Sequence, residues 1–82
     1  MAVTRDRPSH EFLQGIGDRI RQRRAELSLS LRDLKDRTDI SIAFLSQLEN
    51  GVSEPGAVTL LRLSIGLKVT IDWLVKGTEE AS

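Results

Sequence analysis

The stretch LRDLKDRTDISIAFLSQLEN, residues 31–50, decides the fold because it contains two short helical segments with a turn between them. Ser30 is a good N-cap for the first segment, 31–38, and Ser41 for the second, 42–50, since a serine hydroxyl accepts a hydrogen bond from a first-turn amide. Two short helices joined by a turn of about three or four residues form the helix-turn-helix unit. The sequence therefore predicts this unit over the whole stretch.

The reversal between the two segments and the end of the second one also have a basis in the sequence. Asp39 stands where the chain must turn, and aspartate tolerates the left-handed backbone conformation better than most residues other than glycine. Gly51 follows the second segment and can end it in that same conformation. In this unit four apolar side chains would pack the two helices together: Leu34, Ile40, Leu45 and Leu48.

The second segment has an outer face without charge. Phe44 shares the buried side with Leu45 and Leu48, because side chains three and four positions apart lie on one face of a helix. The opposite arc consists of Ile42, Ala43, Ser46, Gln47 and Asn50. We therefore expect a firmly held helix that presents small and uncharged side chains to its surroundings.

Three more segments have helical periodicity, and the sequence shows no convincing strand alternation. The segment 11–27 places four apolar side chains on one arc: Phe12, Ile16, Ile20 and Leu27. The segment 57–68 is rich in apolar residues: Leu60, Leu61, Leu63, Ile65 and Leu67. Thr70 can cap the last segment, 71–77. The sequence thus predicts an all-α fold of five short helices.

We expect one domain over residues 11–77, preceded by a mobile arm at 1–10 and followed by an acidic tail at 78–82. The start MAVTRDRPSH has charges but no apolar run, and no run of about 18 apolar residues occurs anywhere, so neither a signal peptide nor a membrane span is predicted. The chain has no cysteine, which fits a reducing compartment, and we expect a cytoplasmic protein.

The charge balance conceals a polarised distribution. The chain has 12 Lys and Arg against 12 Asp and Glu, which by itself argues against a nucleic-acid binder. Residues 1–37 nevertheless carry nine basic and six acidic side chains, whereas residues 38–82 carry three and six. The densest cluster, DRIRQRR at 18–24, holds four arginines. Such a cluster is either a solvated helix face or part of a binding surface.

Two charges fall in awkward places. Arg24 lies at the edge of the apolar stripe of the first segment, and Glu49 at the edge of the apolar side of the third. Either charge, partly buried and alone, would cost several kcal/mol, whereas an arginine can bond a carboxylate through two nitrogens. We therefore predict an ion pair between them; the alternative is two independent solvated charges.

Enzymatic chemistry has little support in the sequence. The chain offers no cysteine nucleophile and no Gly-rich phosphate loop before a helix. His10, its single histidine, falls in the expected arm and is predicted to be a surface residue rather than a base. One histidine without cysteines cannot form a metal cluster, so we expect no metal site and no cofactor.

Four segments together resemble the Cro and cI-type helix-turn-helix domain of lambdoid phage repressors and bacterial regulators, also called lambda repressor-like or xenobiotic-response-element-type. They are IGDRIRQRRAELSLSLRDL, ISIAFLSQLENG, EPGAVTLLRLSIGL and VTIDWLVKGT. The resemblance covers about residues 16–78, and LENG and VTIDWL are its most specific pieces. In that family the residues at the positions of Arg24 and Glu49 do form an ion pair.

The resemblance implies a sequence-specific transcription regulator that binds operator DNA as a symmetric homodimer. Because the family includes the phage repressors, we expect it to act as a repressor. The helix at 42–50 would enter the major groove with its N-terminal residues at base edges. The family positions for base contact fall on Ser41, Ile42, Ala43, Ser46 and Gln47. Gln47 suits an adenine edge, while Ile42 or Ala43 could contact a thymine methyl.

Other positions carry the remaining contacts that the resemblance implies. Phosphate contacts, which position without specifying, fall on Arg24, Ser30, Leu31, Arg32, Asn50 and Ser53. Candidates for the dimer contact are Lys68, Val69 and Trp73. Trp73 is expected to serve as core or dimer packing and not as a platform for bases.

The sequence departs from the family pattern at four positions. Leu31 stands where glutamine is usual, Lys35 where a small residue is usual, and Asp39 where glycine is usual. Lys35 must then direct its ammonium outward, with its stem on apolar surface. Glu54 stands in a loop that is often basic. Fewer phosphate contacts predict weaker binding and a shallower dependence on salt.

A second function class therefore stays open. The neutral total charge, Leu31, Glu54 and an outward Ile42 also fit a protein-interaction module, such as the antitoxin of a toxin pair or a regulator that needs a protein partner. Antitoxins of this fold also bind DNA, so the two classes overlap. An enzyme is the third class and the one with least support.

Overall fold

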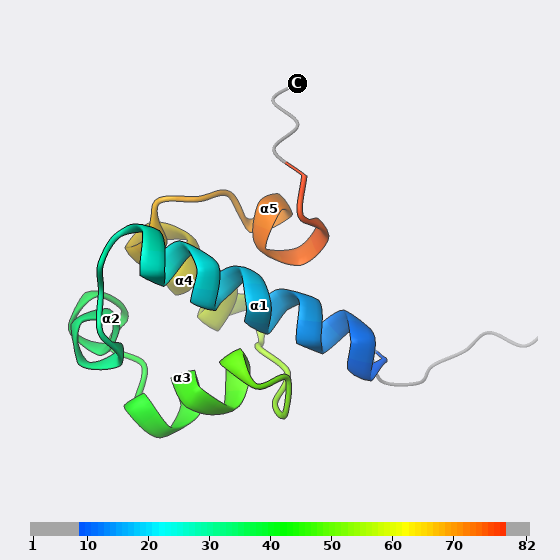
Figure 1. Cartoon of the computed structure of the whole chain (residues 1–82), viewed down its shortest axis with the longest axis horizontal. Coiled ribbons are helices and arrows are strands. Elements are labelled where there is room, and N and C mark those ends of the chain that lie inside the picture. Colours follow the sequence, from blue (N-terminus) through cyan, green and yellow to red (C-terminus); the bar gives the residue numbers. More distant parts are fainter. Residues whose placement is uncertain (1–8, 79–82) are drawn as a thin grey trace, which may run out of the picture.

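The computed structural model describes residues 9–78, and this part of the chain forms five α-helices and no strand (Figure 1). Residues 1–8 of the predicted arm and 79–82 of the predicted tail lie outside the described residues. The helices are α1 (His10–Glu26), α2 (Leu31–Thr38), α3 (Ile42–Glu49), α4 (Ala57–Leu67) and α5 (Ile71–Lys76). The all-α prediction of five short helices is confirmed.

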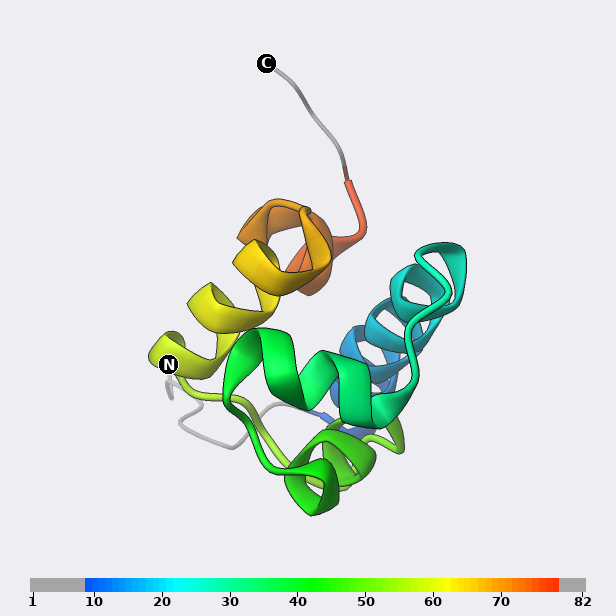
Figure 2. The ribbon, with the colours of Figure 1, turned by 90° about the vertical axis from the view of Figure 1, so that its left-hand side faces the viewer.

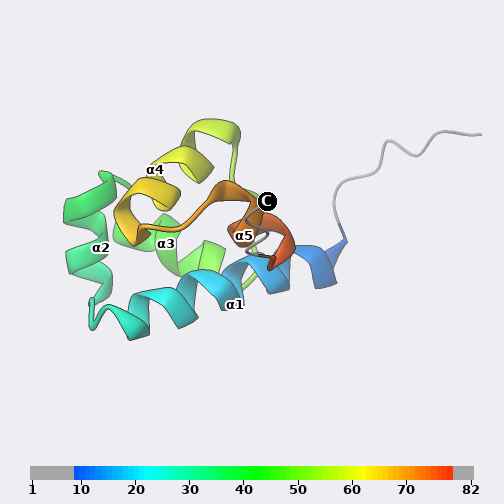
Figure 3. The same cartoon turned by 90° about the horizontal axis from the view of Figure 1, so that it is seen from above.

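The long helix α1 crosses the whole molecule, and the other helices are arranged around it (Figure 1). It packs against α3 on one side and against α4 and α5 on the other. At one end α2 closes the gap between α3 and α4, as the end-on and top views show (Figures 2 and 3). The core that results contains Ile16, Ile20, Leu34, Ile40, Leu45, Leu48, Leu63, Leu67 and Leu74.

Four helices begin at a hydroxyl cap. Ser30, Ser41 and Thr70 accept hydrogen bonds from first-turn amides, as the sequence predicted, and Ser9 does the same for α1. At α2 the cap is reciprocal, because the Asp33 carboxylate also accepts from the Ser30 amide at 2.9 Å. These bonds to Ser30 lower the pKa of Asp33. The start of α2 is therefore fixed from both sides.

The turns on either side of α3 use the left-handed conformation. Asp39, with φ 63°, reverses the chain between α2 and α3, which confirms the role expected for it. After α3, Gly51 has φ 70°, and its amide donates to the Leu48 carbonyl. The Val52 amide reaches back to the Gln47 carbonyl at 2.9 Å. This is the Schellman arrangement, which satisfies carbonyls that a helix end leaves free.

Some expectations about bounds and burial need correction. α1 begins at His10, because Ser9 supplies a cap that the sequence reading left in the arm. α1, α3, α4 and α5 each end one residue earlier than expected, with the next residue serving as the C-cap. Phe12 is 40% exposed, since it precedes the part of α1 that α3 and α5 cover. On α4, Leu61 and Ile65 face outward at 49% and 68% exposure.

Gly17 allows α1 and α3 to approach closely. A Cβ atom built there would overlap the Leu48 carbonyl oxygen and lie 2.6 Å from that of Glu49. Both neighbours are backbone atoms at the C-terminal end of α3, so neither can move aside cheaply. The glycine therefore sets the distance at which α1 holds α3.

Gly17→Ala is expected to destabilise the domain by about 1–3 kcal/mol through overpacking, despite the better helix propensity of alanine. Gly15→Ala is the matched control, because a Cβ there meets only the flexible Arg19 guanidinium at 3.4 Å. That variant should gain up to about 1 kcal/mol. Urea unfolding of both variants checks this, and equal stability of the two would refute the close approach.

Candidate nucleic-acid interface

The outer face of α3 is uncharged and accessible. Ala43, Gln47 and Asn50 are exposed, and Ile42 and Ser46 are half-buried. Ser41, at the N-cap, is exposed as well, and its hydroxyl accepts from the Phe44 amide at 3.1 Å. The six side chains predicted to face outward from this helix and its cap therefore lie on one accessible surface.

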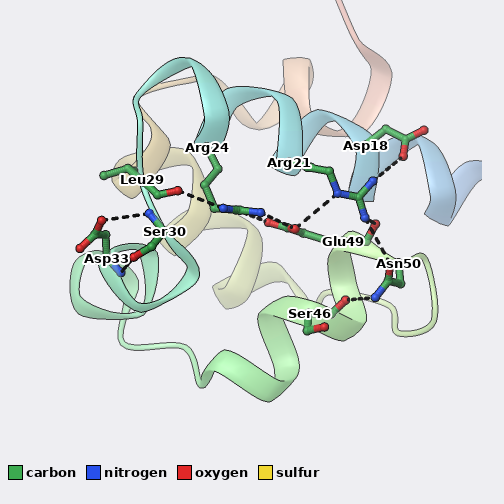
Figure 4. A network of polar contacts seen from close by, with 9 residues as sticks. All are labelled: Asp18, Arg21, Arg24, Leu29, Ser30, Asp33, Ser46, Glu49 and Asn50. Carbon is green, nitrogen blue, oxygen red and sulfur yellow. Dashed lines mark hydrogen bonds and ion pairs between the residues drawn. The ribbon is translucent and has the colours of Figure 1, made fainter.

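The buried side of α3 is held by an ion pair to α1 (Figure 4). Arg24 donates from Nε to Glu49 Oε2 at 2.6 Å and from Nη2 to Oε1 at 3.0 Å. The Glu49 side chain is only 5% exposed and that of Arg24 20%. The predicted pair is thus present with two parallel bonds, and the carboxylate raises the pKa of Arg24. Arg24 also donates to the Leu29 carbonyl, which fixes the chain just before α2.

The Arg24 guanidinium is engaged in contacts that support α3 and is not a free cation at the surface. Each of its three guanidinium nitrogens makes a hydrogen bond inside the protein. A phosphate contact from this side chain, which the family resemblance implied, would have to compete with Glu49 for a largely buried group. We therefore assign Arg24 to the support of α3.

Arg21 is a second support of α3 that the sequence reading missed. It donates from Nη2 to the Glu49 carbonyl at 2.9 Å and to Asn50 Oδ1 at 3.2 Å (Figure 4). Asn50 in turn donates from Nδ2 to the Ser46 carbonyl at 3.0 Å. A cation at the C-terminal end of a helix is favourable because the free carbonyls there carry partial negative charge. Arg21 and Asn50 therefore both bond to groups at the C-terminal end of α3 and help to end the helix there.

The rest of the arginine cluster caps other helices. Arg19 donates to the carbonyls of Leu74 and Val75 at the end of α5, at 2.8 and 2.9 Å. Arg23 donates to the Leu67 carbonyl at the end of α4 at 2.9 Å. All four arginines of the cluster in α1 are therefore engaged within the fold, and the cluster is more than a simple solvated face. The sequence carries no signal for these contacts, because the acceptors are backbone carbonyls.

The start of α2, a helix that packs against α3, holds further candidate residues. The Leu31 side chain packs against the core, so only its backbone amide can donate to a ligand. Ser30 and Arg32 are exposed. The first amides of a helix have no partner within it and favour anions. Lys35 is exposed too, as its position required.

The loop after α3 touches the same face. Ser53 donates its hydroxyl to Gln47 Oε1 at 2.8 Å. Glu54, in the position where a cation was expected, is exposed. The side chain predicted to read a base is thus in contact with a residue predicted to bind phosphate.

The three candidate dimer residues lie elsewhere. Lys68 is exposed and ends α4 in the left-handed conformation, with φ 59°. Val69 and Trp73 are half-buried and pack against the core. Trp73 belongs to α5, which lies across α1 from α3 (Figure 1), and its contact with the core fits a packing role.

Over residues 9–78 no group of His, Asp and Glu side chains is arranged to hold a metal ion. Within the same residues, no helix has the length and apolar character needed to cross a bilayer.

The five helices define a lambda repressor-like helix-turn-helix domain, and the comparisons with known proteins agree. The helix-turn-helix family model HTH_3 matches residues 20–74. The chain therefore belongs to the helix-turn-helix family of Cro/cI-type transcription regulators.

Two curated relatives show the extent of the likeness. DicA of Escherichia coli, an HTH-type transcriptional regulator, is 40% identical over 65 residues, which are 79% of this chain and 48% of DicA. Repressor protein C2 of Salmonella phage P22 is 38% identical over 64 residues, 78% of this chain and 30% of C2. The chain thus spans half or less of the length of these relatives.

Two solved structures have the same architecture. The P22 c2 repressor in complex with a synthetic operator gives a TM-score of 0.75 at 37% identity, covering 79% of this chain and 98% of that one. A chain of the SinR and SinI protein complex gives 0.72 at 29% identity, covering 82% and 66%.

Arg24→Ala is expected to destabilise the domain by up to about 3–5 kcal/mol, because the buried Glu49 carboxylate loses both of its hydrogen bonds and keeps only the longer contact with Arg21 Nε at 3.6 Å. The double variant Arg24→Met, Glu49→Leu should recover most of that loss, since replacing a whole buried pair by apolar residues is often close to neutral. Urea unfolding measures both. Equal stability of wild type and Arg24→Ala would show that the pair does not hold α3.

Proposed function

We propose that this protein is a sequence-specific DNA-binding transcription regulator that acts as a repressor. As a homodimer, it would insert α3 of each copy into the major groove. The observation that carries the proposal is the accessible, uncharged face of α3 fixed from behind by the buried Arg24 and Glu49 pair. A rigid helix with short side chains can approach base edges closely. The operator complex of the similar P22 c2 repressor supports the same use of the fold.

The base contacts in this proposal are those of the α3 face. Gln47 is the hydrogen-bonding reader, because a carboxamide can pair with N6 and N7 of adenine. Ala43 and Ile42, one turn earlier, would meet thymine methyl groups, and Ser41 and Ser46 would offer hydroxyls to nearby edges.

The phosphate contacts would come from the start of α2 and the end of α3. Ser30, Leu31 through its amide, and Arg32 lie at the first site. Asn50 lies at the second, near Ser53, whose hydroxyl already donates to Gln47. Four arginines of α1 are engaged inside the fold. Few free cations are then left beside α3, so we expect modest affinity and a shallow salt dependence.

The dimer would form around the end of α4. Lys68, Val69 and Trp73 were the candidates from the sequence, and the exposed Leu61 and Ile65 lie on the preceding turns of the same helix. Apolar side chains so exposed on a small domain favour a contact with another surface. Two copies joined there would place their α3 helices on neighbouring half-sites about one turn of DNA apart.

A protein-interaction role remains the second candidate, as an antitoxin or as a regulator with a protein partner. Val58, Leu61 and Ile65 form an exposed apolar stripe that supports it. The complex of SinR with SinI shows a protein partner for one similar protein. Catalysis has no such support, since the named relatives are regulators. We also propose a cytoplasmic location, as expected for a regulator that binds DNA.

Gln47→Ala is expected to lower affinity for a DNA site selected from a random pool by about 1–3 kcal/mol and to relax the preference at one base position per half-site. Competition binding against the four single-base variants of that position measures this. Wild-type behaviour of the variant would exclude Gln47 as a reader.

Arg32→Ala serves as the contrast, because it removes a cation at the backbone. It should weaken binding to all sequences alike and lower the slope of log affinity against log salt by about 0.9. A salt titration by fluorescence anisotropy measures the slope. A change confined to one base position would contradict the phosphate role.

Ile65→Glu is expected to leave the fold intact, because Ile65 is 68% exposed, and to abolish the dimer on DNA. Val58→Glu is the matched control, since it changes a similarly exposed residue of α4 nearly three turns from Lys68. Sedimentation with the selected DNA site measures the stoichiometry. A wild-type monomer on DNA would contradict the homodimer.

A further inference from the structure

The turn after α3 brings Ser53 against the side chain of Gln47. The Schellman bonds return the chain at Gly51, so that Val52 donates its amide to the Gln47 carbonyl. The next residue then lies beside the same glutamine, and its hydroxyl reaches Oε1 at 2.8 Å. Two consecutive residues of the loop thus bond to the backbone and the side chain of Gln47.

The loop that carries Ser53 is held in place by the rest of the fold. Gly51 is buried, and a Cβ there would lie 2.8 Å from the Gln14 side chain of α1 and 3.0 Å from its Cα. Pro55 is buried at the other end of the loop. Ser53 therefore lies between two buried residues of the loop, which hold its backbone independently of the Gln47 side chain.

The hydrogen bond distinguishes the two ends of the Gln47 carboxamide. The carbonyl oxygen Oε1 is the end that lies toward the loop, where it accepts from the Ser53 hydroxyl. Nε2 makes no hydrogen bond within residues 9–78, and its two protons are free to donate. Oε1 also retains a second lone pair. Held in this way, the side chain presents a donor and an acceptor together, which is the pattern that pairs with N7 and N6 of adenine.

We propose that Ser53 is a positioning residue for base readout, and that it fixes the orientation of the Gln47 carboxamide instead of binding phosphate. This inference rests on the proposed function. A serine has one O–H proton, and a phosphate oxygen only accepts. Because Ser53 already donates to Gln47, it cannot donate to a phosphate without releasing the carboxamide.

The test compares Ser53→Ala with Ser53→Thr in the full 82-residue chain. Threonine keeps the hydroxyl and serves as the conservative rescue. In the free protein, NMR relaxation of the Gln47 side-chain amide should show greater mobility in the alanine variant and wild-type order in the threonine variant. This readout needs no DNA, so it separates the hydrogen bond from the proposed function.

On DNA, the alanine variant should lose about two- to tenfold of its preference among the four bases at the Gln47 position, which is the range for one exposed hydrogen bond. Its affinity for unrelated DNA and its salt slope should stay at the wild-type values. In a Gln47→Ala background, Ser53→Ala should have no further effect on base preference.

Three results would overturn the inference. Uniform weakening of all sequences with a smaller salt slope would show that Ser53 binds phosphate. Unchanged base preference in a protein that does bind DNA would show that the carboxamide needs no positioning. Failure of the wild type to bind any selected site would overturn the proposed function, and the inference with it.

Discussion

The burial of one carboxylate, that of Glu49, is the constraint on which this structure depends. A buried charge needs a partner, and Arg24 supplies two parallel bonds from α1. Gly17 lets α1 come close enough to α3 for this pairing, because its missing Cβ leaves room for two α3 carbonyls. Together these features fix α3 from its inner side and leave its outer side free for recognition.

Arginines of α1 also cap the C-terminal ends of α3, α4 and α5. Arg19, Arg21 and Arg23 donate to carbonyls at the ends of α5, α3 and α4. From the outside of the fold, Arg37 of α2 does the same for the Gly66 carbonyl of α4. These arginines stabilise the fold through bonds to carbonyls. Because they are engaged in this way, fewer free positive charges remain near α3. The balanced net charge of the chain therefore agrees with the proposal that α3 reads DNA mainly through uncharged contacts.

Much of this could be predicted from the sequence, because the signals were local. Ser30, Ser41 and Asp39 have one conformational role each, and the ion pair follows from two charges on apolar faces. The destinations of Arg19, Arg21 and Arg23 could not be predicted, since backbone carbonyls have no signature in the sequence. The exposure of Ile65 could not be predicted either, because helical periodicity shows which apolar residues share a face but not which face another helix covers.

The most direct measurement is NMR mapping of backbone and side-chain amides during titration with a DNA site selected from a random pool. If α3 reads DNA, the largest shifts will fall on Ala43, Gln47 and the first turn of α2. Shifts confined to the α4 stripe around Leu61 and Ile65, or no shift at any site, would contradict the role assigned to α3.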